Sequence, residues 1–378
     1  MLEVFQRAGF IPRACGWELT LACNLHCKHC GSLAGRGRAD ELSRDECLRV
    51  ADELAELRCE RVTLTGGEPT LHRAWDELAA RMVRQKVRVG LISNAWAWTA
   101  SESERAVRAG LTSVGFSVDG LEHEHDAFRA PGSFLRVVEA IKLARTAGLS
   151  VSINTTLHRL NRGQLAEMRG LLVDLGVRSW QLQLAIPTGA MAQHRELVLP
   201  PEDLLWLVPA IAELCRASST SFRVVASDHI GYFGKPEAHL RTQDVTMPFW
   251  LGCWAGLHVL GIESNGNVKG CLSLPSRLHG ESRYLEGNLR ERSLREIWQR
   301  KTAFAFNRDF RQHDLQGFCL VCRYGDVCRG GCTWVRHSQG NPASGNAYCF
   351  YFQAVRKRRY DLLEDEPTAV EQSYFPAL

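Results

Sequence analysis

The chain has 378 residues, of which 45% are hydrophobic and 23% charged, and its formal net charge is +4. This composition allows a sizeable core and excludes wholesale disorder. The charge excess is spread along the chain, which argues against a basic nucleic-acid-binding surface, and the run Arg356-Lys357-Arg358-Arg359 is expected to be the solvated face of a terminal helix. One large domain with a smaller second domain is the default for this length.

Short apolar runs alternate with amphipathic helical patterns in the first half of the chain. Strands are predicted at 17–21, 61–65, 87–93, 113–118, 149–155 and 179–185, and helices at 43–57, 71–85, 101–109, 134–147 and 164–175. Ser43 with Glu46, and Ser101 with Glu104, are read as capping boxes that open two of these helices.

Strand–helix units in series predict an α/β fold with a parallel sheet and right-handed crossovers, that is, a partial (β/α)6 barrel of the TIM type at 1–190. An open doubly wound sheet fits the same pattern. We expect a bridging segment at 191–250, a small cysteine-rich domain at 251–352 with a hairpin turn at Asn265-Gly266-Asn267, and a C-terminal helix and loose tail at 353–378.

The 14 cysteines are the main compositional signal. The first residues lack an apolar signal-peptide region, and no run is long and apolar enough to span a bilayer, so we expect a cytoplasmic protein without a membrane partner. Tightly spaced cysteines in such a protein indicate metal binding rather than disulfides. Four cysteines lie outside the tight spacings: Cys15, Cys47, Cys59 and Cys215.

The first tight group is Cys23, Cys27 and Cys30, which follows the first predicted strand. Three thiolates can hold three corners of an iron–sulfur cube and leave the fourth iron without a protein ligand. A zinc site completed by His26 or His29 is the alternative. Polar or glycine-rich residues also follow the next strands and should share the same rim of the sheet: Gly66, Gly67, Glu68, Pro69, Asn94, Ser117 and Asp119.

Cys-x3-Cys-x2-Cys after one strand and Gly-Gly-Glu-Pro after the next resemble the radical S-adenosylmethionine (SAM) superfamily. The resemblance implies a 4Fe–4S cluster that binds SAM and generates a 5′-deoxyadenosyl radical. It also implies that Gly66, Gly67 and Pro69 shape the methionine site and that Glu68 accepts the SAM ammonium group. Further SAM contacts implied by it are His29 near adenine, Ser117 and Asp119 at ribose or methionine, Arg129 at the carboxylate, and Asn94, Asn154 and Gln183 at the nucleoside.

A second group of cysteines lies in the last third of the chain, where a structural zinc ribbon is the alternative. The order of these cysteines, with a Gly266-x4-Cys271 hairpin, resembles the SPASM extension of radical SAM maturases, which holds two auxiliary 4Fe–4S clusters. The resemblance implies a distal cluster held by Cys319, Cys322, Cys328 and Cys349, and a nearer cluster held by Cys253, Cys271 and Cys332. The fourth ligand of the nearer cluster stays open.

Proteins that share this arrangement mostly modify precursor peptides, and the Ile230-Gly231-Tyr232-Phe233-Gly234 stretch is typical of that branch. The resemblance therefore implies a peptide maturase with an external electron donor of the flavodoxin or ferredoxin type. Only 22 residues precede Cys23, so we expect a separate protein to recognise the leader if there is one. The alternatives are a dehydrogenase or epimerase of a sugar or antibiotic, with Cys215 as a spare thiol that is better explained as core, and a non-catalytic zinc protein.

Overall fold

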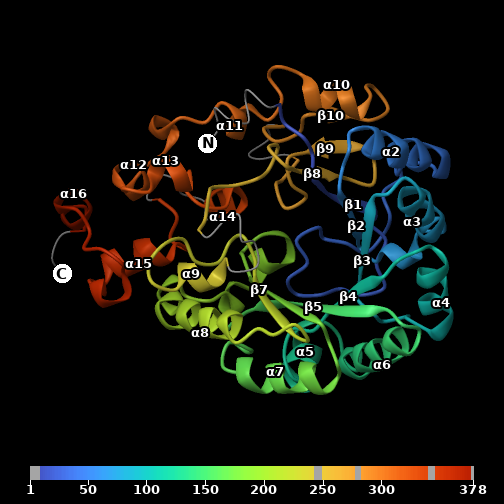
Figure 1. Cartoon of the computed structure of the whole chain (residues 1–378), viewed down its shortest axis with the longest axis horizontal. Coiled ribbons are helices and arrows are strands. Elements are labelled where there is room, and N and C mark those ends of the chain that lie inside the picture. The colour runs from blue at the N-terminus through green and yellow to red at the C-terminus, as the bar shows by residue number, and fades with distance from the viewer. Residues whose placement is uncertain (1–8, 242–248, 277–281, 339–344, 376–378) are drawn as a thin grey trace.

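The computed structural model describes residues 9–241, 249–276, 282–338 and 345–375. Its central feature is one sheet with the strand order β10-β9-β8-β1-β2-β3-β4-β5-β6-β7. Figure 1 shows α2, α3, α4, α6 and α7 along the outer side of this curved sheet, with the C-terminal helices at one end. The expected α/β fold with a parallel sheet is confirmed.

Seven parallel strands, each hydrogen-bonded to the next, form the sheet in the first part of the chain. The segment predicted at 191–250 contains the last of these strands and the helix that precedes it. The strand was not expected. The strands are β1 (Ala14–Thr20), β2 (Arg61–Gly66), β3 (Arg88–Ser93), β4 (Ser113–Ser117), β5 (Ser150–Leu157), β6 (Ser179–Leu184) and β7 (Arg223–Ala226).

The helices between these strands lie close to their predicted positions. They are α2 (Arg44–Glu56), α3 (Trp75–Arg84), α4 (Ala100–Arg108), α5 (Glu122–Phe128), α6 (Ser133–Thr146), α7 (Leu165–Asp174) and α8 (Leu204–Arg216), of which α5 was not predicted.

The capping box of Ser43 and Glu46 at the start of α2 is confirmed. The cap predicted at Ser101 is wrong, because the side chain of Thr99 accepts the hydrogen bond from the Glu102 amide and starts α4 two residues earlier.

The C-terminal third extends the sheet beyond β1. Strand β8 (Val259–Ile262) runs parallel to β1, and β9 (Asn267–Lys269) pairs with it as the predicted hairpin, followed by β10 (Gly287–Asn288). The remaining helices are α9 (Glu237–Leu240), α10 (Leu294–Gln299), α11 (Ala305–Arg308), α12 (Phe318–Val321), α13 (Gly325–Cys328), α14 (Thr333–Ser338), α15 (Phe350–Arg356) and α16 (Ala369–Ser373).

Part of the expected loose tail is helical, because Thr368 and Glu371 form a capping box that opens α16. The last three residues of that tail lie outside the described residues. Side chains of alternate strand positions fill the layer between sheet and helices, with Trp17, Trp75 and Trp180 fully buried. The four cysteines outside the tight spacings are buried in this core, as expected for Cys215. Among the described helices, none has the length and apolarity needed to cross a bilayer.

Candidate functional site

The loop between β1 and α2 carries Cys23, Cys27 and Cys30. Its fold is fixed by main-chain hydrogen bonds, from the Cys23 amide to Gly35 O at 2.9 Å and from the Cys30 amide to Cys27 O at 3.1 Å. Burial raises the pKa of the Cys27 thiol to about 11, the Arg129 guanidinium opposes this shift, and the neighbouring thiols add to it. The three thiols are therefore close enough to interact electrostatically, which fits one shared ligand.

Gly66 and Gly67, at the end of β2, pack against the main chain that leads into this loop. A Cβ on Gly67 would lie 2.2 Å from Ala22 O, and one on Gly66 would lie 2.3 Å from Thr20 O. The loop backbone itself therefore requires both glycines. Ala22 directly precedes Cys23, so these two positions also determine where the first thiol lies.

Glu68 lies beneath the rim rather than on it. Only 1% of its surface is exposed, and its carboxylate accepts hydrogen bonds from the Thr70 amide at 3.2 Å, the Thr70 hydroxyl at 2.6 Å and the Asn94 amide at 2.7 Å. The Asn94 side chain in turn donates to Asn24 at 2.8 Å and lies 3.6 Å from Cys23 Sγ. Both residues therefore support the cysteine loop, and Pro69 opens the short 3-10 turn that follows Glu68.

Asp119 and Arg129 form a buried ion pair, with Arg129 Nε donating to Asp119 Oδ2 at 2.5 Å. The same guanidinium lies 3.9 Å from Cys27 Sγ and 3.4 Å from His29 Nε2. The second Asp119 oxygen accepts the Thr156 amide, and Asp119 has no exposed surface. Asp119 therefore positions Arg129 beside the cysteine loop.

The imidazole of His29 stacks on Phe128 with the two ring centroids 4.3 Å apart. Burial lowers the pKa of His29 to about 3, so the ring is neutral at pH 7. His29 lines the main cavity described next, together with Ser117, Arg129 and Gln183, whose amide donates to the Thr156 hydroxyl at 3.0 Å. Asn154 sits on β5 opposite Ser117 of β4, and its main-chain oxygen accepts the Val118 amide.

A cavity of about 1070 Å³ runs from the cysteine loop to the C-terminal third of the chain. Its lining includes Cys30 and Gly66 from the barrel and Cys253, Cys271 and Cys332 from the second cysteine group. Burial raises the pKa of the Cys332 thiol, and the thiols of Cys253 and Cys271 raise it further, so these three also form one electrostatic group. We call them the inner triad.

Four further cysteines surround a second, smaller cavity with an apolar lining: Cys319, Cys322, Cys328 and Cys349. Burial raises the pKa of the Cys328 thiol, and Cys319 and Cys322 add to this shift. We call these residues the distal quartet. Across the described ranges no three His, Cys, Asp or Glu side chains converge on a single-ion site. The sets of three, three and four thiols fit iron–sulfur clusters, which are larger than one ion.

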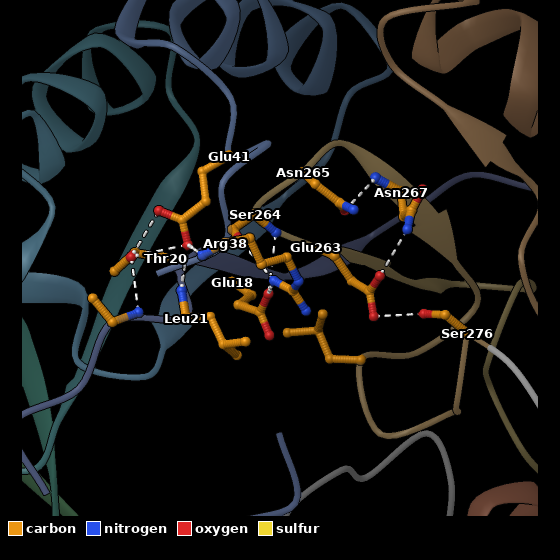
Figure 2. Close-up of polar contacts among 12 residues, drawn as sticks. Glu18, Thr20, Leu21, Arg38, Glu41, Glu263, Ser264, Asn265, Asn267 and Ser276 are labelled. Atoms are coloured by element: carbon orange, nitrogen blue, oxygen red, sulfur yellow. Dashed lines mark hydrogen bonds and ion pairs between the residues drawn. The ribbon is translucent and has the colours of Figure 1, made fainter. Parts of the chain in front are cut away.

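Polar contacts join the cysteine loop to the β8–β9 hairpin along one wall of the cavity (Figure 2). Arg38 contacts Glu18 of β1 and Ser264 of the hairpin, and Glu41 accepts hydrogen bonds from Thr20 and the Leu21 amide. The Glu263 carboxylate accepts hydrogen bonds from the side-chain amide of Asn267, the Ser276 hydroxyl and the ammonium of the buried Lys269. The loop that holds the first thiols is therefore attached directly to the C-terminal hairpin.

Several residues of this site were not singled out in the sequence. Phe128, His158 and Asp228 reach the site only through tertiary contacts. Asp228 follows β7, the strand that the sequence pattern missed, and a correct assignment of Arg223–Ala226 as a strand would have placed Asp228 on the rim.

Two family models match the chain: the radical SAM superfamily at residues 17–172 and the SPASM iron–sulfur cluster-binding domain at residues 253–323. The AdoMet-dependent heme synthase of Methanosarcina barkeri is 29% identical and aligns over 90% of this chain and 97% of its own length. The mycofactocin maturase MftC of Mycolicibacterium smegmatis is 30% identical and aligns over 91% of this chain and 84% of its own length.

The fold is similar to solved structures at low sequence identity. SuiB of Streptococcus suis bound to S-adenosylmethionine superposes with a TM-score of 0.71 at 17% identity, covering 90% of this chain and 78% of SuiB. Native anSMEcpe with bound AdoMet gives a TM-score of 0.66 at 16% identity, covering 92% of this chain and 97% of anSMEcpe.

Proposed function

The chain belongs to the radical SAM superfamily and carries a SPASM domain, and from this we propose that it is a peptide maturase that removes a hydrogen atom from a precursor peptide bound in the main cavity. Its cofactors are SAM, the 4Fe–4S cluster that binds SAM and auxiliary clusters in the SPASM domain. The bound cluster and SAM supply a 5′-deoxyadenosyl radical.

The proposed ligands of the SAM-binding cluster are Cys23, Cys27 and Cys30, with the inner triad and the distal quartet as the ligands of two auxiliary clusters. Around the first site, Arg129 supplies a fixed positive charge that Asp119 orients, and we assign it to the SAM carboxylate. Ser117, Gln183 and the edge of His29 present polar groups along the cavity, where the nucleoside is expected. Glu68 and Asn94 hold the cysteine loop through their hydrogen bonds, and we keep Glu68 as the proposed acceptor of the SAM ammonium group and Asn94 as a proposed nucleoside contact.

The charges of the cavity lining support a peptide as the substrate. Three of its cationic side chains are already paired with carboxylates, Arg38 with Glu18, Arg129 with Asp119 and Lys269 with Glu263. The rest of the wall combines apolar side chains with amide and hydroxyl groups, the latter including Gln181, Gln183, Thr156, Ser117 and Ser273. Such a wall fits the amide donors and acceptors of a peptide backbone better than it fits a ligand with several anionic groups.

Asp228 is the second feature of the wall that supports this assignment. Asp228 lines the cavity with an exposed side chain, and desolvation there raises the pKa of its carboxyl. In the described part of the chain this carboxylate takes part in no ion pair or side-chain hydrogen bond. We assign it to a cationic or hydrogen-bond-donating group of the substrate.

A tetrapyrrole, the compound class of heme, is the second candidate substrate. The heme synthase of Methanosarcina barkeri aligns over 97% of its own length, and Arg61 adds a guanidinium to the cavity lining that forms no ion pair with another described residue. A cavity of about 1070 Å³ accommodates a ligand of that size.

The experiment uses the full chain, reconstituted anaerobically with iron and sulfide. Dithionite or a reduced flavodoxin is the electron source, and each short peptide encoded beside the gene is offered in parallel with an iron tetrapyrrole. A peptide maturase gives 5′-deoxyadenosine together with a mass change in one peptide. Conversion of the tetrapyrrole alone would select the second candidate. SAM cleavage that survives replacement of Cys23, Cys27 and Cys30 by alanine would refute the proposed ligands.

A further inference from the structure

The turn at 231–234 has four consecutive residues with positive φ, two of them not glycine. Gly231, Tyr232, Phe233 and Gly234 have φ values of +103°, +78°, +64° and +87°. Bulky residues adopt this left-handed region only where their surroundings impose it, and such strain concentrates at functional sites. The side chain of Tyr232 is also fully buried.

A buried ion pair holds the turn in place. The Glu237 carboxylate accepts hydrogen bonds from the Tyr232 amide at 3.1 Å and the Trp250 amide at 2.8 Å. Arg241 pairs with Glu237 at 3.0 Å and donates to Ile230 O at 2.6 Å. The position of Tyr232 is therefore fixed from its amide side.

The main chain of the turn contacts the distal quartet. Its carbonyl groups accept the first amides of α15, Phe350 N to Gly231 O at 2.9 Å and Tyr351 N to Tyr232 O at 3.4 Å. Cys349, which directly precedes α15, has its sulfur 4.0 Å from Tyr232 O. The aromatic ring of Tyr232 also lines the small cavity of the distal quartet.

The hydroxyl of the same residue reaches the inner triad. It accepts the Cys332 amide hydrogen at an N–O distance of 2.9 Å and donates to Asp228 O at 2.9 Å. The ring packs against Gly331, where a Cβ would come within 2.8 Å of it. Tyr232 thus contacts Cys332 and the cavity wall through its hydroxyl, and the Cys349 segment through its main-chain oxygen.

Resting on the proposed cysteine ligands, we propose that Tyr232 is a positioning residue that joins the two auxiliary sites and sets the potential of the inner one. Hydrogen bonds to cluster sulfur make a cluster easier to reduce. The Tyr232 hydroxyl binds the Cys332 amide hydrogen and keeps it from such a bond, so it holds the potential of the inner cluster low. The same contact fixes Cys332 relative to Asp228.

The test compares Tyr232→Phe with the parent chain, each in a background where Cys23, Cys27 and Cys30 are alanine, so that only the auxiliary clusters remain. Iron and sulfide content are measured first, and redox titrations followed by EPR then give the midpoint potentials. We expect normal iron content, a more positive potential for the inner cluster and an unchanged potential for the distal one. Tyr348→Phe is the matched control, because its buried hydroxyl donates to Leu199 O at 2.7 Å and should shift neither potential.

Unchanged potentials in a fully loaded Tyr232→Phe protein would overturn the inference while leaving the cysteine ligands in place. A parent protein that takes up no iron would overturn the ligand assignment and the inference together. If Tyr232→Phe fails to fold, 3,5-difluorotyrosine at the same position keeps the ring and hydroxyl and weakens the oxygen as an acceptor. It should give a smaller shift of the same sign, and no shift would refute the role.

Discussion

Replacing Gly67 by alanine tests the claim that the β2 rim fixes the cysteine loop. The new Cβ would lie 2.2 Å from Ala22 O and 2.7 Å from Leu21 O, and both obstacles are main-chain atoms. Relief requires a backbone shift on the order of 1 Å, which as overpacking costs about 1–3 kcal/mol. That shift also weakens the bonds from the Gly67 amide to Thr20 O and from the Glu68 amide to Ala22 O, both 2.8 Å long, at about 1 kcal/mol each.

Together these terms predict that Gly67→Ala lowers the free energy of unfolding by about 3–5 kcal/mol. Because Ala22 precedes Cys23, iron bound at the first site should fall as well. Anaerobic urea unfolding followed by circular dichroism measures the first effect, and iron and sulfide analysis measures the second.

Gly170→Ala is the matched control. Gly170 lies within α7, a Cβ there meets no atom within 4 Å, and the change should stabilise the protein by about 0.5–1 kcal/mol. A Gly67→Ala protein that unfolds within about 1 kcal/mol of the parent and binds as much iron would refute the reasoning.

Three further predictions concern titratable side chains. Asp119→Asn leaves the Arg129 guanidinium buried without its anion and should lower the free energy of unfolding by about 3–5 kcal/mol in urea titrations, whereas replacing both residues by apolar ones should restore part of this loss. Burial lowers the pKa of His229 to about 4, and its Nε2 accepts a hydrogen bond from the Leu184 amide. The folded state therefore favours the neutral form of the ring. The unfolded ring protonates near pH 6.5, so stability should fall by up to about 3 kcal/mol between pH 6.5 and 4, and His229→Gln should remove that part of the pH dependence. Asp228→Asn should lower kcat/KM for the peptide substrate about 10- to 100-fold, measured by mass spectrometry of the product; an unchanged value would exclude Asp228 as a substrate contact.

Local patterns predicted most of the first half of the fold. The apolar runs marked six parallel strands, and the Ser43 and Glu46 pair marked the start of α2. Strand β7 was missed because Arg223–Ala226 is only four residues long and offers too few positions for an alternating pattern. Its partner β6 supplies the hydrogen bonds that define it, and that pairing is not written in the local sequence.

The candidate site was predictable where chemistry depends on spacing and unpredictable where it depends on tertiary pairing. The cysteine spacings indicated two cysteine-rich groups, and the resemblance to the SPASM extension implied how the second group divides. The sequence could not show that Glu68 is buried under the Thr70 and Asn94 amides, or that Asp119 is occupied by Arg129. Carboxylates are assigned to a ligand by default when they follow a strand, and only the packed structure shows whether a nearer donor has already bound them.

The pairing of β8 with β1 explains how a barrel and a cysteine-rich segment share one cavity. Strand β1 leads into the first cysteine loop, and β8 leads into the hairpin that ends at Cys271, with Trp17 opposite Ile262 in the register. The spacing between the first thiols and the inner triad is therefore set by two hydrogen-bonded strands rather than by a flexible linker. Arg38, held by Glu18 and Ser264, fixes the same spacing from the loop side. In the proposed function, electron exchange and substrate positioning both depend on that distance, so we assign the contacts in Figure 2 to the catalytic architecture even though none of their side chains needs to react.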